Sequence, residues 1–96
     1  MNGHKDNTQK EYFKRINKVI NYIEKNLDSE LNLKDLSKKA FFSSFHFHRI
    51  FTAVVGETLN SFIIRKRIER IASVLAVGSD ESLIDLALKY GFSNAS

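Results

Sequence analysis

Hydrophobic residues recur along this chain at spacings of three and four, a period that predicts helices almost throughout. No segment alternates strictly between apolar and polar residues, and the sequence contains no proline. The first nine residues are polar, and we expect them to form a disordered tail. From Lys10 to about Leu27, five apolar residues share one face of a predicted amphipathic helix: Phe13, Ile16, Ile20, Ile23 and Leu27.

Residues 33–56 predict two short helices joined by a tight turn. The first carries Leu33, Leu36 and Ala40 on one face, and Asn32 is placed to cap its start. After the turn at residues 41–42, Ser43 is the predicted N-cap of the second helix, and Gly56 suits a left-handed cap at its end. The second helix has an apolar seam that we expect to be buried: Phe47, Ile50, Phe51 and Val54.

The opposite face of this second helix carries chemistry that a solvated face rarely has. At about 100° per residue, four side chains fall together on it: Phe45, His48, Arg49 and Thr52. An arginine can bond the O6 and N7 atoms of guanine, and an aromatic ring or a threonine methyl can contact the methyl group of thymine. We therefore predict that these four residues contact DNA bases; for Phe45, packing under the N-terminal helix remains the alternative.

The rest of the chain predicts two more helices. Thr58 is placed to cap a long helix that ends near Val77, and its apolar residues spread over more than one stripe. We therefore expect this helix to pack against two neighbours. Ser82 is the predicted cap of a short helix that runs to Tyr90, and Gly91 stops it.

Several sequence blocks together resemble the DNA-binding domain of the AraC family of bacterial transcription regulators. They are LKDLSKKA at 33–40, FSSFHFHRIF at 42–51, GETL at 56–59, RIER at 67–70 and SLIDLALKYGFSNAS at 82–96. The resemblance runs from about Glu11 to Ser96. Two residues depart from the family pattern: Phe41 stands where many members have glycine in the turn, and Ile64 replaces a commonly polar residue.

The resemblance implies an all-α fold: a homeodomain-like three-helix unit with a helix-turn-helix (10–56), a linker helix (58–77) and an incomplete second helix-turn-helix (82–96). It implies that the helix from Ser43 to Val55 reads a major groove of duplex DNA. A second recognition helix would begin near residues 94–96, so the chain reads as a fragment. FSSFHFHRIF is most like the subgroup in which a GyrI-like ligand-binding domain often follows. RNA polymerase is an expected partner of the whole protein.

Phosphate contacts are predicted for two groups of residues. Ser43, Ser44 and His46 lie at the start of the recognition-like helix. The long helix carries four cations that could lie near the intervening phosphates: Arg65, Lys66, Arg67 and Arg70. Two alternatives stay open, because His46 could be a packing residue and the four cations could belong to a solvated face, on which charges contribute little.

Composition agrees with a polyanion partner. Lys and Arg outnumber Asp and Glu by 15 to 11, which gives a net charge of +4. Zero cysteines exclude disulfides and thiolate metal sites. His46 and His48 cannot hold one metal ion, because residues two apart on a helix point about 200° away from each other. We predict no cofactor, no metal and no enzymatic activity, and a cytoplasmic protein without a signal peptide or membrane span.

A protein-interaction module is the rival prediction. It would dock through the face of Phe45 and His48, together with Phe92, or through a C-terminal apolar patch. Leu83, Leu86 and Phe92 would form this patch, and we expect it to support weak self-association. A salt titration separates the two predictions, since DNA binding weakens steeply as salt rises.

Overall fold

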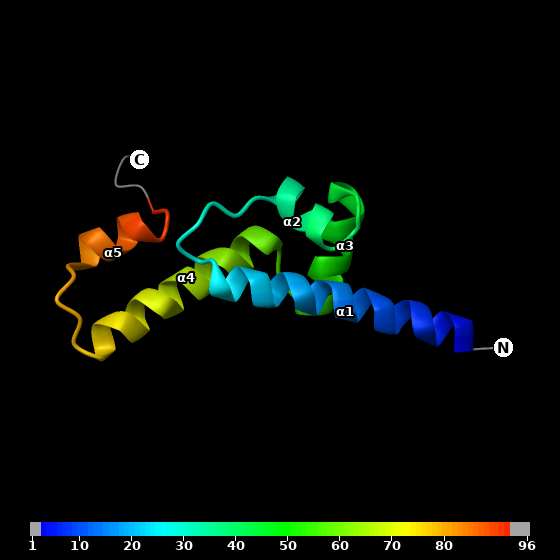
Figure 1. Cartoon of the computed structure of the whole chain (residues 1–96), viewed down its shortest axis with the longest axis horizontal. Coiled ribbons are helices and arrows are strands. Elements are labelled where there is room, and N and C mark those ends of the chain that lie inside the picture. The colour runs from blue at the N-terminus through cyan, green and yellow to red at the C-terminus, as the bar shows by residue number, and fades with distance from the viewer. Residues whose placement is uncertain (1–2, 93–96) are drawn as a thin grey trace.

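The structure, a computed structural model, describes residues 3–92. In this range the chain forms helices and no strand, as the sequence predicts. The helices are α1 (Gly3–Lys25), α2 (Leu33–Lys39), α3 (Ser44–Val55), α4 (Leu59–Ala76) and α5 (Leu83–Lys89). Figure 1 shows α2 and α3 together on one side of α1, while α5 lies beside the C-terminal half of the long α4. The molecule is elongated, with extents of 58 × 28 × 19 Å.

Side-chain caps set where four of the helices begin, and all four were predicted. Asn32, Ser43, Thr58 and Ser82 each accept a hydrogen bond from the backbone N–H three residues ahead, at 2.9–3.2 Å. Such a bond satisfies one of the backbone donors that the first turn of a helix leaves free. Gly56 ends α3 in the left-handed conformation, with φ of 87°. The local sequence therefore specifies the boundaries of these helices.

The N-terminal helix differs from the prediction at its start. α1 begins at Gly3, so the expected disordered tail is wrong for residues 3–9. A helix that is already formed gains one hydrogen bond for each residue added, and this polar segment contains no proline to stop it. A polar composition therefore did not distinguish a tail from the first turns of this helix.

The buried face of α1 is also rotated from the predicted stripe. Val19 is fully buried, although it was not among the predicted residues, whereas Phe13 is 52% exposed. Ile16, Ile23 and Leu27 are buried as expected. Val19 lies three residues after Ile16 and four before Ile23, so the contact with α2 and α3 is centred on its side of the helix.

The core is centred on α3. Phe47 and Phe51 are fully buried, and the ring of Phe51 meets that of Phe62 from α4 edge to face at 5.5 Å. Val54 departs from the predicted seam, since it is 37% exposed. Val55 packs against the core instead, because the last turn of α3 is covered from the side of α4.

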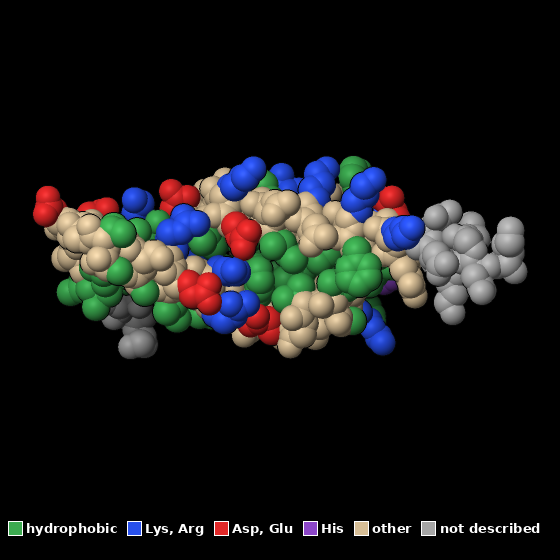
Figure 2. Space-filling view, turned by 90° about the horizontal axis from the view of Figure 1, so that it is seen from below, with side chains coloured by type: hydrophobic (Ala, Val, Ile, Leu, Met, Phe, Trp, Pro, Cys, Tyr) green, Lys and Arg blue, Asp and Glu red, His purple; other side chains and the backbone are tan. Residues whose placement is uncertain are grey.

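The C-terminal helix is held to α4 by a smaller contact. Leu86 is fully buried and Tyr90 is 6% exposed, while Phe92 packs against them partly buried. The predicted apolar patch therefore loses Leu86, because α4 already covers it. The exposed apolar side chains of α5 are Leu83, Ile84 and Leu88. In Figure 2 hydrophobic side chains are visible at this end of the molecule, near the C-terminal half of α4.

Candidate nucleic-acid interface

The turn between α2 and α3 is built on a strained residue. Phe41 has φ of 59°, in the left-handed region that glycine occupies without cost. The N–H of Phe42 donates to the carbonyl of Ser37 at 3.0 Å and closes the end of α2. A residue with a Cβ costs about 1–2 kcal/mol in this conformation. The phenylalanine that departs from the family pattern thus keeps the turn geometry of a glycine.

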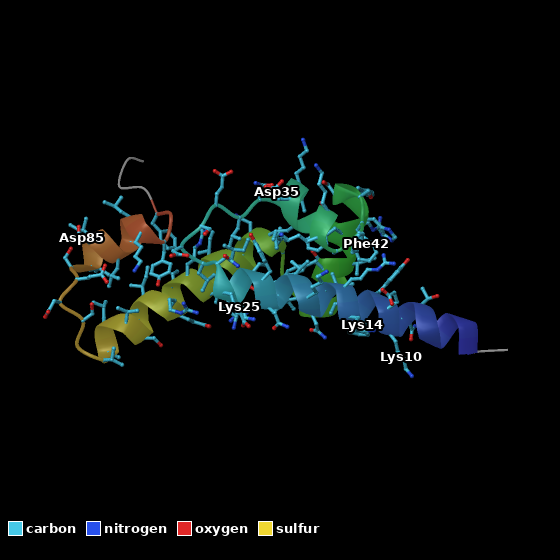
Figure 3. The ribbon with its side chains drawn as sticks, in the orientation of Figure 1. Lys10, Lys14, Lys25, Asp35, Phe42 and Asp85 are labelled. Carbon is cyan, nitrogen blue, oxygen red and sulfur yellow. The ribbon has the colours of Figure 1, made fainter. Side chains whose placement is uncertain are left out.

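An aromatic cluster holds the start of α3 against α1. Tyr12, Phe42 and His46 meet edge to face, with ring centroids 5.0–5.9 Å apart. The guanidinium of Arg15 lies 4.9 Å from the centroid of Phe42 and donates to the carbonyl of Phe41 at 3.3 Å. Figure 3 shows Phe42 at this junction. His46 therefore packs on this cluster while its side chain stays exposed, and its predicted phosphate contact stays a prediction.

Sequence reasoning missed the roles of Tyr12 and Arg15. They lie three residues apart on α1, a spacing that places both side chains on one side of a helix. That spacing was the available signal, but the aromatic partners come from 30 residues further along the chain.

The outward face of α3 gathers three of the four predicted base-contacting residues. Phe45 is 62% exposed, and His48 and Arg49 are exposed as well. The guanidinium carbon of Arg49 lies 5.7 Å from the centroid of the Phe45 ring, within the range of a cation–π contact. Phe45 does not pack under α1. In the part of the chain that the structure describes, Arg49 makes no ion pair, so its donors face solvent.

Thr52 differs from the other three. Its hydroxyl oxygen is enclosed and has no hydrogen-bond partner among residues 3–92. In this conformation Thr52 offers no hydroxyl to a ligand outside α3. The helical period predicts on which side of α3 Thr52 lies, but it cannot predict the side-chain rotamer that encloses the hydroxyl.

The two serines at the start of α3 are engaged within the protein. The Oγ of Ser43 accepts the N–H of His46 at 3.2 Å. The Oγ of Ser44 lies 3.2 Å from that of Ser37, a buried serine that also donates to the carbonyl of Leu33. Both hydroxyls therefore tie α3 to its own first turn and to α2.

Two of the four cations on α4 form ion pairs. Arg65 bonds Glu57 at 2.7 Å and Glu69 at 2.9 Å. The hydrogen bond from Arg65 holds the pKa of Glu57 below its ordinary value, against a smaller opposing effect of burial. Lys66 lies 3.2 Å from Glu24 of α1. These pairs neutralise the positive charge where phosphate contacts were predicted.

The other two cations of α4 bond backbone carbonyls. Arg67 donates to Leu27 at 3.0 Å and to Ser29 at 2.7 Å, so it ties α4 to the segment that joins α1 and α2. Burial lowers the pKa of Arg67 from its ordinary value. Arg70 donates to the carbonyl of Glu24 at 3.1 Å. Both side chains hold helices together in the free protein.

Two other kinds of feature, a metal-ligand cluster and a membrane-spanning helix, are not found among the described residues. No three His, Asp or Glu side chains in this range gather as metal ligands would. None of its helices combines the length and apolar character that a membrane crossing needs.

A cap-bounded pair of short helices on a three-helix core, with one exposed aromatic and basic face, defines a helix-turn-helix protein. The comparisons with known proteins agree, because a family described as "Helix-turn-helix domain" matches residues 36–96. The chain belongs to this family, in the AraC type of DNA-binding transcription regulators that the sequence blocks predicted.

Three relatives support this assignment. The chain is 40% identical over 81 residues, 84% of its length, to the uncharacterized HTH-type transcriptional regulator YbfP of Bacillus subtilis. It is 35% identical over 77 residues to the HTH-type transcriptional activator AarP of Providencia stuartii and 34% identical over 77 residues to the multiple antibiotic resistance protein MarA of Escherichia coli, 80% of its length in each case.

The chain spans only part of each relative: 27% of YbfP, 56% of AarP and 60% of MarA. Four expectations from the sequence stay predictions: a GyrI-like domain, contact with RNA polymerase, a cytoplasmic location and the absence of enzymatic activity. The start of a second recognition helix near residues 94–96 lies outside the described residues.

Proposed function

We propose that this chain is the DNA-reading part of a transcription regulator and that α3 enters a major groove of duplex DNA. The observation that carries the proposal is the division of α3 into two faces. Phe47 and Phe51 hold one face in the core, while Phe45, His48 and Arg49 share the exposed one. A major groove of about 12 Å admits one helix, whose exposed side chains then meet the base edges.

Arg49 is the principal base-reading residue in this proposal. Its guanidinium can donate two parallel hydrogen bonds to O6 and N7 of guanine. The ring of Phe45 supports the guanidinium from one side and presents an apolar edge to a thymine methyl. His48 adds a donor or acceptor one turn away from Phe45. Thr52 can contribute only its methyl group to a thymine contact, because its hydroxyl is enclosed.

Phosphate contacts are proposed at the start of α3 and not along α4. Ser43, Ser44 and His46 lie at the N-terminal end of a 12-residue helix, where the helix dipole favours an anion. Within residues 3–92 the Oγ of Ser43 only accepts a bond, so its own O–H can still donate to a phosphate. The four cations of α4 are left out because each bonds a carboxylate or a carbonyl of this chain. α4 keeps a geometric role, since its 18 residues span roughly 27 Å at ~1.5 Å per residue, close to the ~34 Å between successive major grooves.

A binding-site selection tests the proposal. Arg49→Ala should weaken binding to the selected site by about 1–3 kcal/mol and relax preference at one base pair. Lys34→Ala is the matched control, because it removes an exposed cation from α2 without changing α3. Equal weakening of Arg49→Ala on every sequence would show that Arg49 contacts phosphate only.

A salt titration of the unmodified chain adds a second test. Binding to duplex DNA should fall steeply between about 50 and 200 mM salt, since phosphate contacts release counterions. Binding that hardly responds to salt would contradict the proposal and would favour an apolar docking face.

A further inference from the structure

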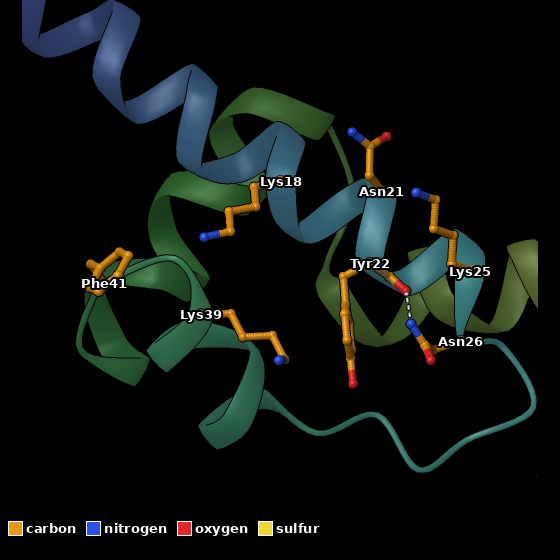
Figure 4. Close-up of a pocket in the computed structure, with 7 residues that line it drawn as sticks. All are labelled: Lys18, Asn21, Tyr22, Lys25, Asn26, Lys39 and Phe41. Carbon is orange, nitrogen blue, oxygen red and sulfur yellow. Dashed lines mark hydrogen bonds between the residues drawn. The ribbon is translucent and has the colours of Figure 1, made fainter.

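A hollow of about 440 Å³ lies between α1 and the α2–α3 turn, and none of its lining residues belongs to α3. Figure 4 shows Lys18 and Lys39 reaching into this space from opposite sides, with the ring of Tyr22 beside them. The α1 residues of the wall recur at spacings of three and four, so they occupy one side of that helix. This volume is within the usual range for small-molecule sites.

The charge of the hollow is one-sided. Lys18, Lys25 and Lys39 line it, and none of its lining residues is acidic. These three lysines form no ion pair with residues 3–92, whereas Arg15, Arg65 and Lys66 each pair with a carboxylate. Figure 3 shows Lys10, Lys14 and Lys25 along the same helix, so the positive potential extends beyond the hollow. An anion is the ligand that this arrangement favours.

Two aromatic rings give the hollow flat apolar walls. The ammonium of Lys39 lies 4.2 Å from the centroid of Tyr22, and that of Lys18 lies 5.6 Å from the centroid of Phe41. The left-handed turn leaves Phe41 73% exposed. Asn26 donates to the carbonyl of Tyr22 at 2.8 Å and closes the end of α1 (Figure 4). An exposed ring on a strained turn is costly for folding alone, and a flat ligand would cover it.

We propose that this hollow binds a small organic anion with a planar apolar body. A carboxylate or phosphate group would lie between the ammonium groups of Lys18 and Lys39, and the planar body would stack against Tyr22 or Phe41. Glu30 and Asp35 line the neighbouring hollow, which shares Tyr22 and Lys39, so their charge keeps the anion on the side of Lys18. The site is independent of the proposed DNA-reading face.

The first experiment is an NMR titration of the 96-residue chain with sodium 1-naphthoate. We expect saturable shifts at the backbone amides of Tyr22, Asn26, Lys39 and Phe41. Neutral 1-naphthalenemethanol and inorganic phosphate are the matched probes, and each should bind at least about tenfold more weakly. Equal binding of the alcohol would show an apolar surface only, and equal binding of phosphate a counter-ion site only. Either result, or shifts without saturation, would overturn the proposal.

Variants then test the named residues. Lys18→Ala, Lys39→Ala and Phe41→Gly should each weaken naphthoate binding by at least about fivefold. Phe41→Gly removes the ring and also relieves the positive φ, so lost folding cannot explain its effect. Lys34→Ala is the control, because this exposed lysine of α2 lies outside the hollow and should change affinity less than about twofold. A loss as large for Lys34→Ala would show a general charge effect and contradict the site.

A duplex DNA arm separates this site from the proposed function. Naphthoate affinity should be unchanged when DNA is bound, because none of the hollow's lining residues belongs to α3. Competition by DNA would overturn the proposal and assign the hollow to the phosphate backbone. Tighter binding of a glutamate-rich peptide than of naphthoate would also overturn it and indicate a polypeptide partner.

Discussion

The two halves of α4 are held in different ways. Its N-terminal half packs Phe62 and Ile63 into the core with α1, α2 and α3. The three cations of this half bond Glu57, Glu24, Leu27 and Ser29, and Arg70 in the next turn bonds Glu24. Its C-terminal half contacts α5, which buries Leu86 and Tyr90. Beyond Arg70, the described residues contain no ion pair and no side-chain bond between helices. The N-terminal unit, formed by α1, α2, α3 and the first part of α4, is therefore held by both core packing and polar bonds, whereas α5 depends on a few apolar contacts.

This difference indicates which parts of the molecule can carry a functional site. A helix can expose an aromatic and basic face only if its other face is firmly held, and α3 meets that condition through Phe47 and Phe51. At α5 the exposed side chains are aliphatic, and nothing chemical distinguishes them from uncovered core. Exposure alone does not mark a site; exposure on a rigid element with polar chemistry does.

The largest effect that tests this comparison is expected from Phe51→Ala. Its ring is fully buried between α3 and α4, so its removal should lower the free energy of unfolding by about 3–5 kcal/mol. Leu86→Ala is the matched change in α5. We expect it to accelerate amide exchange in α5 while the N-terminal unit keeps its protection. A chemical denaturation series together with hydrogen exchange measures both, and equal global losses would show that the two halves fold as one unit.

The second prediction concerns Arg67, the tie between α4 and the α1–α2 segment. Arg67→Ala leaves the carbonyls of Leu27 and Ser29 without these donors, and we expect a loss of about 2 kcal/mol of stability. Arg70→Ala removes a single exposed bond to Glu24 and should cost less. Thermal melts of both variants show which substitution lowers stability more. An Arg67→Ala variant as stable as the unmodified chain would mean that solvent replaces these bonds fully.

Local signals in the sequence predicted much of this architecture. The caps at Asn32, Ser43, Thr58 and Ser82 follow from side-chain chemistry within three residues, so the boundaries could be predicted. The rotation of a helix about its axis could not be predicted in the same way. Phe13 was expected to be buried and Val19 was not, and the reverse holds because of how α2 and α3 pack against α1. Local periodicity carries no information about partners far along the chain.

The candidate site shows the same limit. Periodicity alone predicted the shared face of Phe45, His48 and Arg49, because all three lie on one helix. The cations of α4 were predicted as phosphate contacts from their charge and from the linking role that the resemblance implies for this helix, but Arg67 bonds carbonyls 38 and 40 residues away. The sequence could not show these bonds, since they depend on how α4 lies against the end of α1.

A smaller effect is expected at the exposed face of α5. We expect a weak, concentration-dependent association through Leu83, Ile84 and Leu88, because these side chains have no cover among residues 3–92. Leu83→Glu with Leu88→Lys should abolish it and change stability by less than about 0.5 kcal/mol, since the new charges suit the two ends of the helix.

Sedimentation at increasing concentration measures this association. Phe13→Glu is the control, because Phe13 is 52% exposed on α1, outside this face, and its replacement should leave association unchanged. An unmodified chain that sediments as a monomer at every concentration would contradict the prediction.

The smallest effect is a pH dependence at the start of α4. The hydrogen bond from Arg65 lowers the pKa of Glu57 in the folded protein below its ordinary value of 4.5. A carboxylate with a lowered folded pKa stabilises the fold at pH values above its unfolded pKa, and this contribution is lost as the pH falls through the folded pKa. Glu57→Gln should therefore lower the melting temperature slightly at pH 7, and the difference should shrink below the unfolded pKa and vanish once the pH lies below the folded pKa. Because the pair is exposed, high salt should also reduce it. Thermal melts from pH 7 to pH 3 at low and high salt measure the difference in melting temperature between Glu57→Gln and the unmodified chain. A difference that grows toward low pH would show that the bond does not stabilise the N-terminal half of α4.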